Sequence, residues 1–156
     1  NQILSSQTKP AFRMLAKIIE LCPKSLWAQR NIDPHIWQQI YHILYALDYW
    51  FSHSKASFKQ PVFEDDVNPV LGEESKGFIE QSEMIEYLKY VKKKSDDYIS
   101  NLNPENVSGP SPIYPKWTNL DVIIEQIRHF QHHIGYLNRT LLKCKLEPVE
   151  WEMYED

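Results

Sequence analysis

Apolar residues recur every three or four positions in four separate segments of this chain, and this pattern constrains the fold more than any other feature. The segments cover residues 9–22, 36–51 and 82–102, and a stretch that begins after Pro115 and continues to Leu141. Such spacing places apolar side chains on one face of an α-helix. The four faces consist of Ala11, Met14, Leu15, Ile18 and Leu21; Ile36, Ile40, Ile43, Leu47 and Trp50; Met84, Leu88, Val91, Tyr98 and Leu102; and Ile123, Ile127, Phe130, Ile134, Leu137 and Leu141. Because no alternating pattern of strand length accompanies them, the sequence predicts an all-α four-helix bundle.

Residues that favour helix starts and loops divide the four segments. Asp33 is a suitable N-cap for the second helix, with Pro34 at its first helical position. Thr118 or Asn119 can cap the fourth helix. Residues 54–81, between the second and third helices, are rich in Pro, Asp and Gly and form a long connection for a compact domain. This connection is long enough to cross the bundle, so the second and third helices need not be antiparallel neighbours.

Length, charge and cysteine content limit the kinds of protein this chain can be. Its 156 residues suit one domain spanning residues 1–156. The net charge is −4 and the one basic run, residues 92–94, lies among acidic residues, so we expect a solvated helix face and no nucleic-acid partner. No signal peptide and no apolar run of membrane-spanning length is visible, which favours the cytoplasm and no membrane partner. Two cysteines, Cys22 and Cys144, are too few for a disulfide framework.

Three histidines are candidates for a shared metal site. His129 and His133 are four residues apart, so a helix places both imidazoles on one face about one turn apart. On a helical wheel both flank the apolar face of the fourth helix on the same side, whereas His132 points away from the core. His42, in the second helix, lies on the same-handed flank of its own apolar face. Two neighbouring helices can therefore direct His42, His129 and His133 into one pocket.

The chemistry of three imidazoles favours a transition metal. Neutral histidine is a ligand for Zn, Ni, Fe or Cu, and three protein ligands leave at least one coordination position open, as in catalytic zinc sites. Such binding should weaken below about pH 6, as the imidazoles protonate. The alternative is that the histidines are ordinary surface residues on a helix flank. His35 and His53, near the ends of the second helix, are expected to face solvent.

Other polar and aromatic residues have two readings each. Asp48 and Glu125 can accept a hydrogen bond from a ligand histidine, or can be charges on helix surfaces. Trp151 and Tyr154, in the acidic C-terminal tail, are expected to pack on the bundle or on a partner. The second helix carries more aromatic residues than one apolar face needs, which indicates either core packing or a homodimer face. These residues are Trp37, Tyr41, Tyr45, Tyr49, Trp50 and Phe51.

Two stretches together resemble the DinB/YfiT superfamily of metalloenzymes. One stretch is residues 41–50, YHILYALDYW, and the other is residues 128–138, RHFQHHIGYLN. The resemblance covers nearly the whole chain, including the long connection after the second helix. It implies a four-helix bundle with up-down-down-up connectivity and a divalent metal held by His42, His129 and His133. It also implies a homodimer.

The resemblance sets the expected range of functions. Characterised members of the superfamily include S-transferases that use bacillithiol and maleylpyruvate isomerases that use mycothiol. We therefore expect an enzyme that depends on a divalent metal (Zn or Ni, with Fe as a further option). Its reaction would be thiol-dependent S-transfer or hydrolysis of a small electrophile, with a low-molecular-weight thiol as one substrate. The alternative function is a non-catalytic, metal-stabilised helical dimer that acts as an interaction module.

Overall fold

Each of the four apolar patterns forms a long helix in the computed structural model, which describes residues 2–29 and 34–153. The long helices are α1 (Gln2–Leu21), α3 (Ile36–Trp50), α4 (Gln81–Ser100) and α5 (Asn119–Lys143), and a single short turn, α2 (Lys24–Trp27), follows α1. No strand occurs among the described residues, where the one β-bridge joins Pro110 to Thr118. The prediction of an all-α helical bundle is confirmed. No helix in the described ranges is long and apolar enough to cross a membrane.

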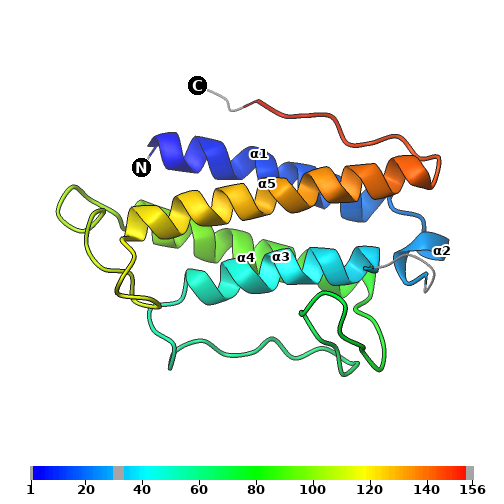
Figure 1. The fold of residues 1–156 in the computed structure, drawn as a ribbon, viewed down its shortest axis with the longest axis horizontal. Coiled ribbons are helices and arrows are strands. Elements are labelled where there is room, and N and C mark those ends of the chain that lie inside the picture. Colours follow the sequence, from blue (N-terminus) through cyan, green and yellow to red (C-terminus); the bar gives the residue numbers. More distant parts are fainter. Residues whose placement is uncertain (1, 30–33, 154–156) are drawn as a thin grey trace.

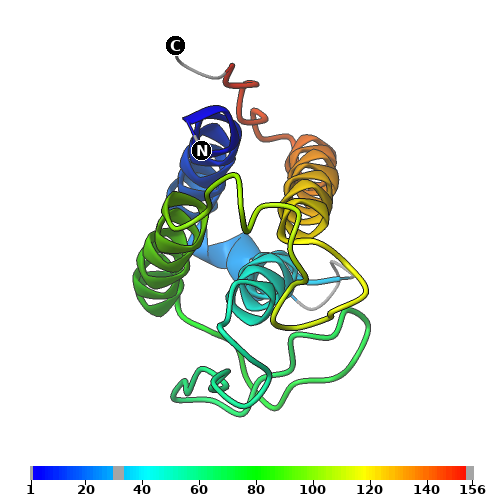
Figure 2. The same ribbon diagram turned by 90° about the vertical axis from the view of Figure 1, so that its left-hand side faces the viewer.

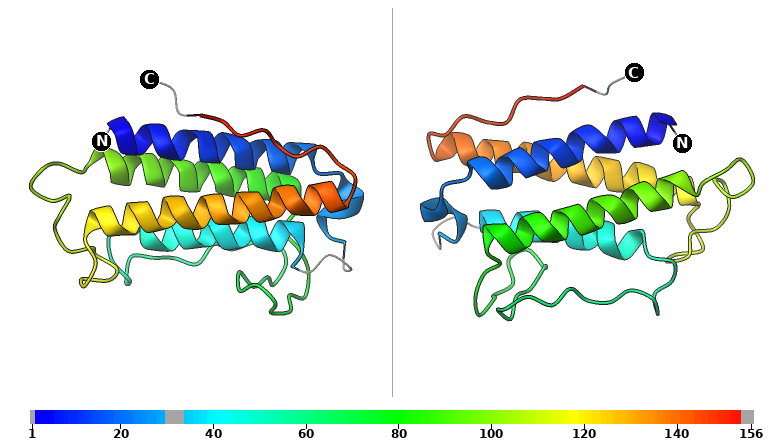
Figure 3. Two further views of the ribbon diagram at one scale, coloured as in Figure 1. Left: turned by 45° about the horizontal axis from the view of Figure 1, so that its top comes forward. Right: turned by 180° about the vertical axis from the view of Figure 1, so that it is seen from behind.

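The four long helices pack as a square in which each of them packs mainly against two others. Helices α1 and α3 lie diagonally opposite each other, and each packs against both α4 and α5 (Figure 2). Helices α1 and α5 run in one direction, and α3 and α4 run in the other (Figures 1 and 3). Because α3 and α4 are parallel, the chain between them must return along the length of the bundle. Figure 1 shows this crossover beneath α3.

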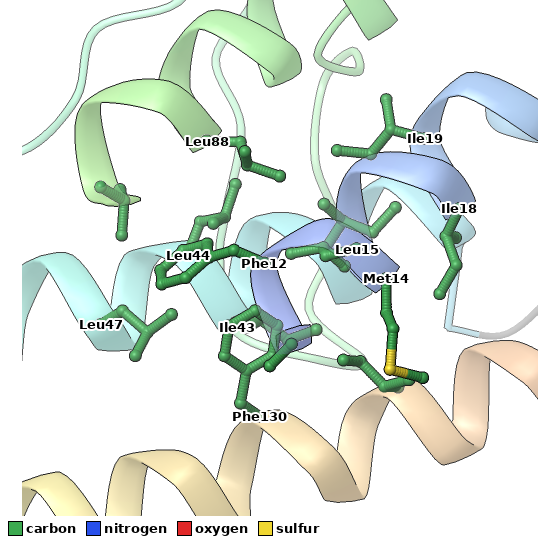
Figure 4. Packing of buried hydrophobic residues seen from close by; sticks show 14 of the residues in the cluster. Phe12, Met14, Leu15, Ile18, Ile19, Ile43, Leu44, Leu47, Leu88 and Phe130 are labelled. Carbon is green, nitrogen blue, oxygen red and sulfur yellow. The ribbon is translucent and has the colours of Figure 1, made fainter. Parts of the chain in front are cut away.

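The core is built from the predicted apolar faces of all four long helices. Phe12 of α1 and Phe130 of α5 meet edge to face, with ring centroids 5.1 Å apart. Ile43 and Leu44 of α3 and Leu88 of α4 complete this part of the core (Figure 4). Burying an aliphatic or aromatic side chain of this size stabilises a fold by about 1.5–3 kcal/mol. Leu21 was expected to belong to the apolar face of the first helix, and this prediction is wrong. Its side chain is 65% exposed because α1 ends there.

Three helix starts differ in how well the sequence predicts them. The apolar pattern predicts a start near Lys9, whereas α1 begins at Gln2 and contains Pro10. Helix α3 begins at Ile36 with His35 as its N-cap, so Pro34 is not its first helical residue, and Asp33 lies outside the described residues. Thr118 is the N-cap of α5: its hydroxyl accepts a hydrogen bond from the backbone N–H of Asp121. The Asp121 carboxylate accepts one from the backbone N–H of Thr118 in return.

The crossover covers the outer face of α3 and accounts for its surplus aromatic residues. Phe58 packs edge to face on Tyr45 and Tyr49, with ring centroids 5.3 and 5.2 Å apart. Phe63 packs in the same way on Tyr41, at 5.3 Å. Trp37 and Phe51 are buried in the core. Trp50 is half-buried and stacks on Trp117, with ring centroids 5.3 Å apart. Packing within the chain therefore accounts for these side chains, and the homodimer stays a prediction.

A buried ion pair joins α3 to α4 and corrects two expectations. Asp48 is 2% exposed, so it is not a helix-surface charge. Its carboxylate accepts hydrogen bonds from Lys94 and, at 2.9 Å, from the Tyr87 hydroxyl. Lys94 also donates to the Ser52 hydroxyl at 2.7 Å. The run at residues 92–94 is therefore not wholly a solvated face, because Lys94 turns inward to a carboxylate 46 residues away in sequence.

The C-terminal tail returns along the bundle and is fixed by polar contacts. The side-chain amide of Asn138 donates to the Val149 carbonyl, and its oxygen accepts from the Val149 N–H, each at 2.9 Å. Glu152 forms ion pairs with Arg13 and Lys17 of α1. Trp151 is 67% exposed, so the prediction that it packs on the bundle is wrong, and packing on a partner stays a prediction. Tyr154 lies outside the described residues.

Candidate metal centre

The structure brings His42, His129 and His133 together between α3 and α5. His42 lies near the middle of α3, and the other two lie on the face of α5 that meets it. The ring centroid of His42 lies 5.0 Å from that of His129 and 4.9 Å from that of His133. The ring centroids of His129 and His133 are 4.7 Å apart. Each residue offers one ring nitrogen, and the three nitrogens lie within 4.8 Å of one another. This group could bind a metal ion.

The spacing of two ring nitrogens fits a shared ion. Nε2 of His42 and Nε2 of His129 are 3.1 Å apart. Two nitrogens bound tetrahedrally to one ion, at about 2.0–2.1 Å each, would lie roughly 3.3 Å apart. Small movements of the two side chains would therefore suffice to place an ion between them.

A backbone carbonyl from the crossover orients the His42 ring. Nδ1 of His42 lies 3.0 Å from the carbonyl oxygen of Pro69. A carbonyl can only accept, so Nδ1 carries the proton and donates. The lone pair is then on Nε2, which faces Nε2 of His129 at 3.1 Å. Ligand histidines commonly donate their second ring nitrogen to a carbonyl in this way. The hydrogen bond thus fixes the tautomer that can bind a metal through Nε2.

Burial keeps the three imidazoles neutral. Desolvation, followed by the neighbouring imidazoles, lowers the pKa of His129 to about 4 and that of His133 to about 3. Desolvation also lowers the pKa of His42, although its hydrogen bond to Pro69 opposes this. Neutral rings at pH 7 keep their lone pairs available, which is the state that metal coordination requires.

Buried polar atoms around the cluster have no partner among the described residues. They include Nδ1 of His129 and Nδ1 of His133. Nε2 of Gln39 and Oε1 of Gln126 are also unpaired, and these residues lie three positions before His42 and His129 on the same helices. An unpaired buried polar atom is costly, and binding of a metal, water or substrate would relieve that cost. One sequence signal could have identified these glutamines: each lies three residues before a candidate ligand histidine, on both helices.

The remaining candidate histidines are not part of the three-histidine group. His132 and His53 are exposed, as expected. His35 is half-buried instead: its ring stacks on Trp37 and its Nδ1 lies 3.1 Å from the Gln29 carbonyl oxygen.

Neither candidate carboxylate is seen to hold a ligand histidine. Glu125 forms an ion pair with Arg128 at 3.1 Å, and Asp48 binds Lys94 and Tyr87. His42 is oriented instead by the backbone carbonyl of Pro69. Every residue has such a carbonyl, so the sequence does not single out Pro69.

We expect the metal-free protein to lose stability between about pH 6.5 and pH 4. The unfolded chain titrates near the ordinary histidine value of 6.5, whereas the folded pKa values of His129 and His133 lie near 4 and 3. Protons in this window bind the unfolded state preferentially, so the free energy of unfolding falls as the pH falls. Urea unfolding of the metal-free protein at a series of pH values measures this slope.

The control for the pH series is the double variant His129→Gln/His133→Gln, which retains every carboxylate. Its stability should fall less steeply over the same window. Equal slopes for the two proteins would contradict the prediction.

The same pKa values imply that protons compete with a metal in the folded protein mainly near pH 4, below the value of about pH 6 expected for ordinary histidines.

Comparisons of the chain with protein-family models, with curated proteins and with solved structures found no match. A metal centre is therefore inferred from the three imidazoles themselves.

Proposed function

We propose that the chain is a metal-dependent enzyme whose ion is held by His42, His129 and His133. The observation that carries this proposal is the convergence of three neutral imidazoles, with no carboxylate or thiol in the same group among the described residues. Structural zinc sites are usually filled by four protein ligands, whereas catalytic sites keep a position open. Zn or Ni suits this donor set best, and Fe is also compatible.

The chain's own residues prepare the site for a polar or anionic reactant. A bound ion would supply Lewis acidity, which activates a water or holds a thiolate for attack on an electrophile. His42 and His129 are half-buried, so the cluster is not fully sealed from solvent, whereas His133 is buried. Pro69 holds His42 in the binding tautomer. The unpaired amide atoms of Gln39 and Gln126 offer hydrogen bonds to a reactant.

The arrangement of the helices supports a place in the DinB/YfiT-like superfamily. The parallel pair α3 and α4, with the long crossover between them, is what the sequence resemblance implies (Figure 1). On this basis the proposed reaction is S-transfer from a low-molecular-weight thiol, or hydrolysis, with a small electrophile as substrate. A cytoplasmic homodimer is part of the same proposal.

The test compares metal content with metal-dependent reaction rates. The chain is purified without a metal-affinity tag, analysed for Zn, Ni and Fe, and then assayed in metal-loaded and metal-stripped form. The assays follow loss of a thiol, cysteine or bacillithiol, with 1-chloro-2,4-dinitrobenzene, and hydrolysis of p-nitrophenyl acetate. About one equivalent of metal and a rate lost both on stripping and in His42→Ala would support the proposal. Absence of bound metal after dialysis against Zn²⁺ and Ni²⁺ would refute it.

A metal-stabilised interaction module is the second candidate. It is favoured by the pairing of both candidate carboxylates with cations: Asp48 pairs with Lys94, and Glu125 pairs with Arg128. This function predicts one equivalent of metal and a higher melting temperature on metal binding, without any metal-dependent rate.

A further inference from the structure

Gln38, one helical turn before His42 on α3, holds the crossover segment that contacts the metal centre. Its side chain is buried, and its amide nitrogen lies 3.2, 3.0 and 2.8 Å from the carbonyl oxygens of Asn68, Val70 and Glu73. The three partners can only accept hydrogen bonds, so the nitrogen of the amide must face them and its oxygen must point elsewhere. Gln38 therefore ties both ends of a six-residue segment to α3.

The same segment contains the carbonyl that orients His42. Three consecutive carbonyl oxygens, at Asn68, Pro69 and Val70, are bound from one face of α3. Gln38 binds the first and third, and His42 binds the second. Because residues i and i+4 lie one above the other on a helix, the two side chains grip the segment side by side.

Contacts within the segment transmit this hold over a short distance. The Ser75 hydroxyl accepts a hydrogen bond from the Asn68 N–H at 2.8 Å, and the Asn68 side chain accepts one from the Val70 N–H at 2.9 Å. Pro69 lies between these two residues and has a restricted φ. Fixing the carbonyls on either side of Pro69 therefore fixes the direction of its own carbonyl.

We propose that Gln38 is a positioning residue for the metal centre, acting on His42 through the carbonyl of Pro69. This inference rests on the proposed function where it concerns metal affinity. Without the amide of Gln38, the segment can move away from α3 and the His42 ring loses the hydrogen bond that fixes its tautomer and orientation. Loss of such an outer partner lowers metal affinity by about 10- to 100-fold.

The test variant is Gln38→Glu, which keeps the size of the side chain and replaces the donor by an acceptor. We expect its affinity for Zn²⁺, measured by competition with a chromophoric chelator, to fall by about 10- to 100-fold. In the metal-free protein, ¹⁵N NMR of the histidine rings should show His42 with a proton on Nδ1 in the wild type. In Gln38→Glu it should show a mixture of the two tautomers.

The matched control is Gln81→Glu on α4. The Gln81 amide nitrogen also donates to backbone carbonyls, those of Ile19 and Cys22, both at 2.8 Å, at a site unconnected with the cluster. This control should retain wild-type Zn²⁺ affinity and the wild-type tautomer of His42. A loss of affinity in Gln81→Glu equal to that in Gln38→Glu would assign both effects to general destabilisation and overturn the proposal.

A second variant guards against failure of Gln38→Glu to fold. Ser75→Ala removes a hydroxyl of the crossover without changing the core, and it should cause a smaller change of tautomer and affinity in the same direction. Wild-type tautomer and affinity in every variant that folds would overturn the proposal. If the wild type binds no metal, the proposed function fails, and the tautomer of His42 in the metal-free variants still decides the role of Gln38.

Discussion

Replacing His133 by alanine is expected to lower the affinity of the protein for Zn²⁺ by roughly 100- to 1,000-fold. Structural zinc sites release about 10–16 kcal/mol through four ligands, or roughly 2.5–4 kcal/mol for each, and each 1.4 kcal/mol corresponds to about tenfold in affinity. His133 is the most buried of the three histidines, and its pKa of about 3 keeps it neutral throughout the useful pH range. Chelator competition at pH 7 measures the loss.

The neighbouring histidine supplies the control for this experiment. His132→Ala removes an exposed imidazole whose ring packs edge to face on His133 at 5.1 Å but which lies outside the cluster. Zn²⁺ affinity should remain within about threefold of the wild type, because a surface substitution of this kind has small effects. Equal losses in the two variants would show that the helix as a whole, and not the His133 ligand, determines binding.

The melting temperature offers an independent measurement of the same site. A ligand that binds only the folded protein stabilises it by RT ln(1 + [L]/Kd). Zn²⁺ should therefore raise the melting temperature of the wild type and of His132→Ala at metal concentrations that leave His133→Ala unchanged. A similar rise in all three proteins would indicate that Zn²⁺ binds elsewhere.

The parts of the site that can be predicted from sequence depend on local periodicity. His129 and His133 share a face because they are four residues apart on one helix, and the apolar pattern of α5 fixes the direction of that face. The same reasoning places His132 outside and His42 on the flank of α3. Helix geometry, once a segment is known to be helical, determines these directions without any tertiary information.

The parts that could not be predicted depend on pairings between distant segments. The carbonyl of Pro69 reaches His42 across 27 residues, and Gln38 reaches Glu73 across 35. A backbone acceptor leaves no mark in the sequence, and a buried glutamine looks like any polar residue until its partners are known. The start of α1 at Gln2 could not be predicted for a different reason. A proline usually marks a helix boundary, yet Pro10 lies inside α1.

The ion pair between Asp48 and Lys94 also joins residues far apart in sequence and could not be predicted from the sequence. We expect its loss to cause a large decrease in stability. Asp48→Ala is expected to reduce the free energy of unfolding by about 3–5 kcal/mol, because breaking a buried pair leaves an uncompensated charge. Lys94 would keep its hydrogen bonds to the Ser52 hydroxyl and the Asp48 backbone carbonyl but would lose the only carboxylate that it contacts among the described residues. Tyr87 would lose its acceptor. Urea unfolding at pH 7 measures the loss.

The adjacent lysine provides a matched comparison on the same helix. Lys93 and Asp97 form an exposed pair at 2.6 Å, and Asp97→Ala should leave stability almost unchanged, because exposed pairs contribute little. The double variant Asp48→Ala/Lys94→Met should be more stable than the sum of the two single losses predicts, since neither charge is left alone. Strict additivity of the losses in unfolding free energy would mean that Asp48 and Lys94 act independently. A loss in Asp48→Ala no larger than that in Asp97→Ala would mean that the buried pair does not hold α3 to α4.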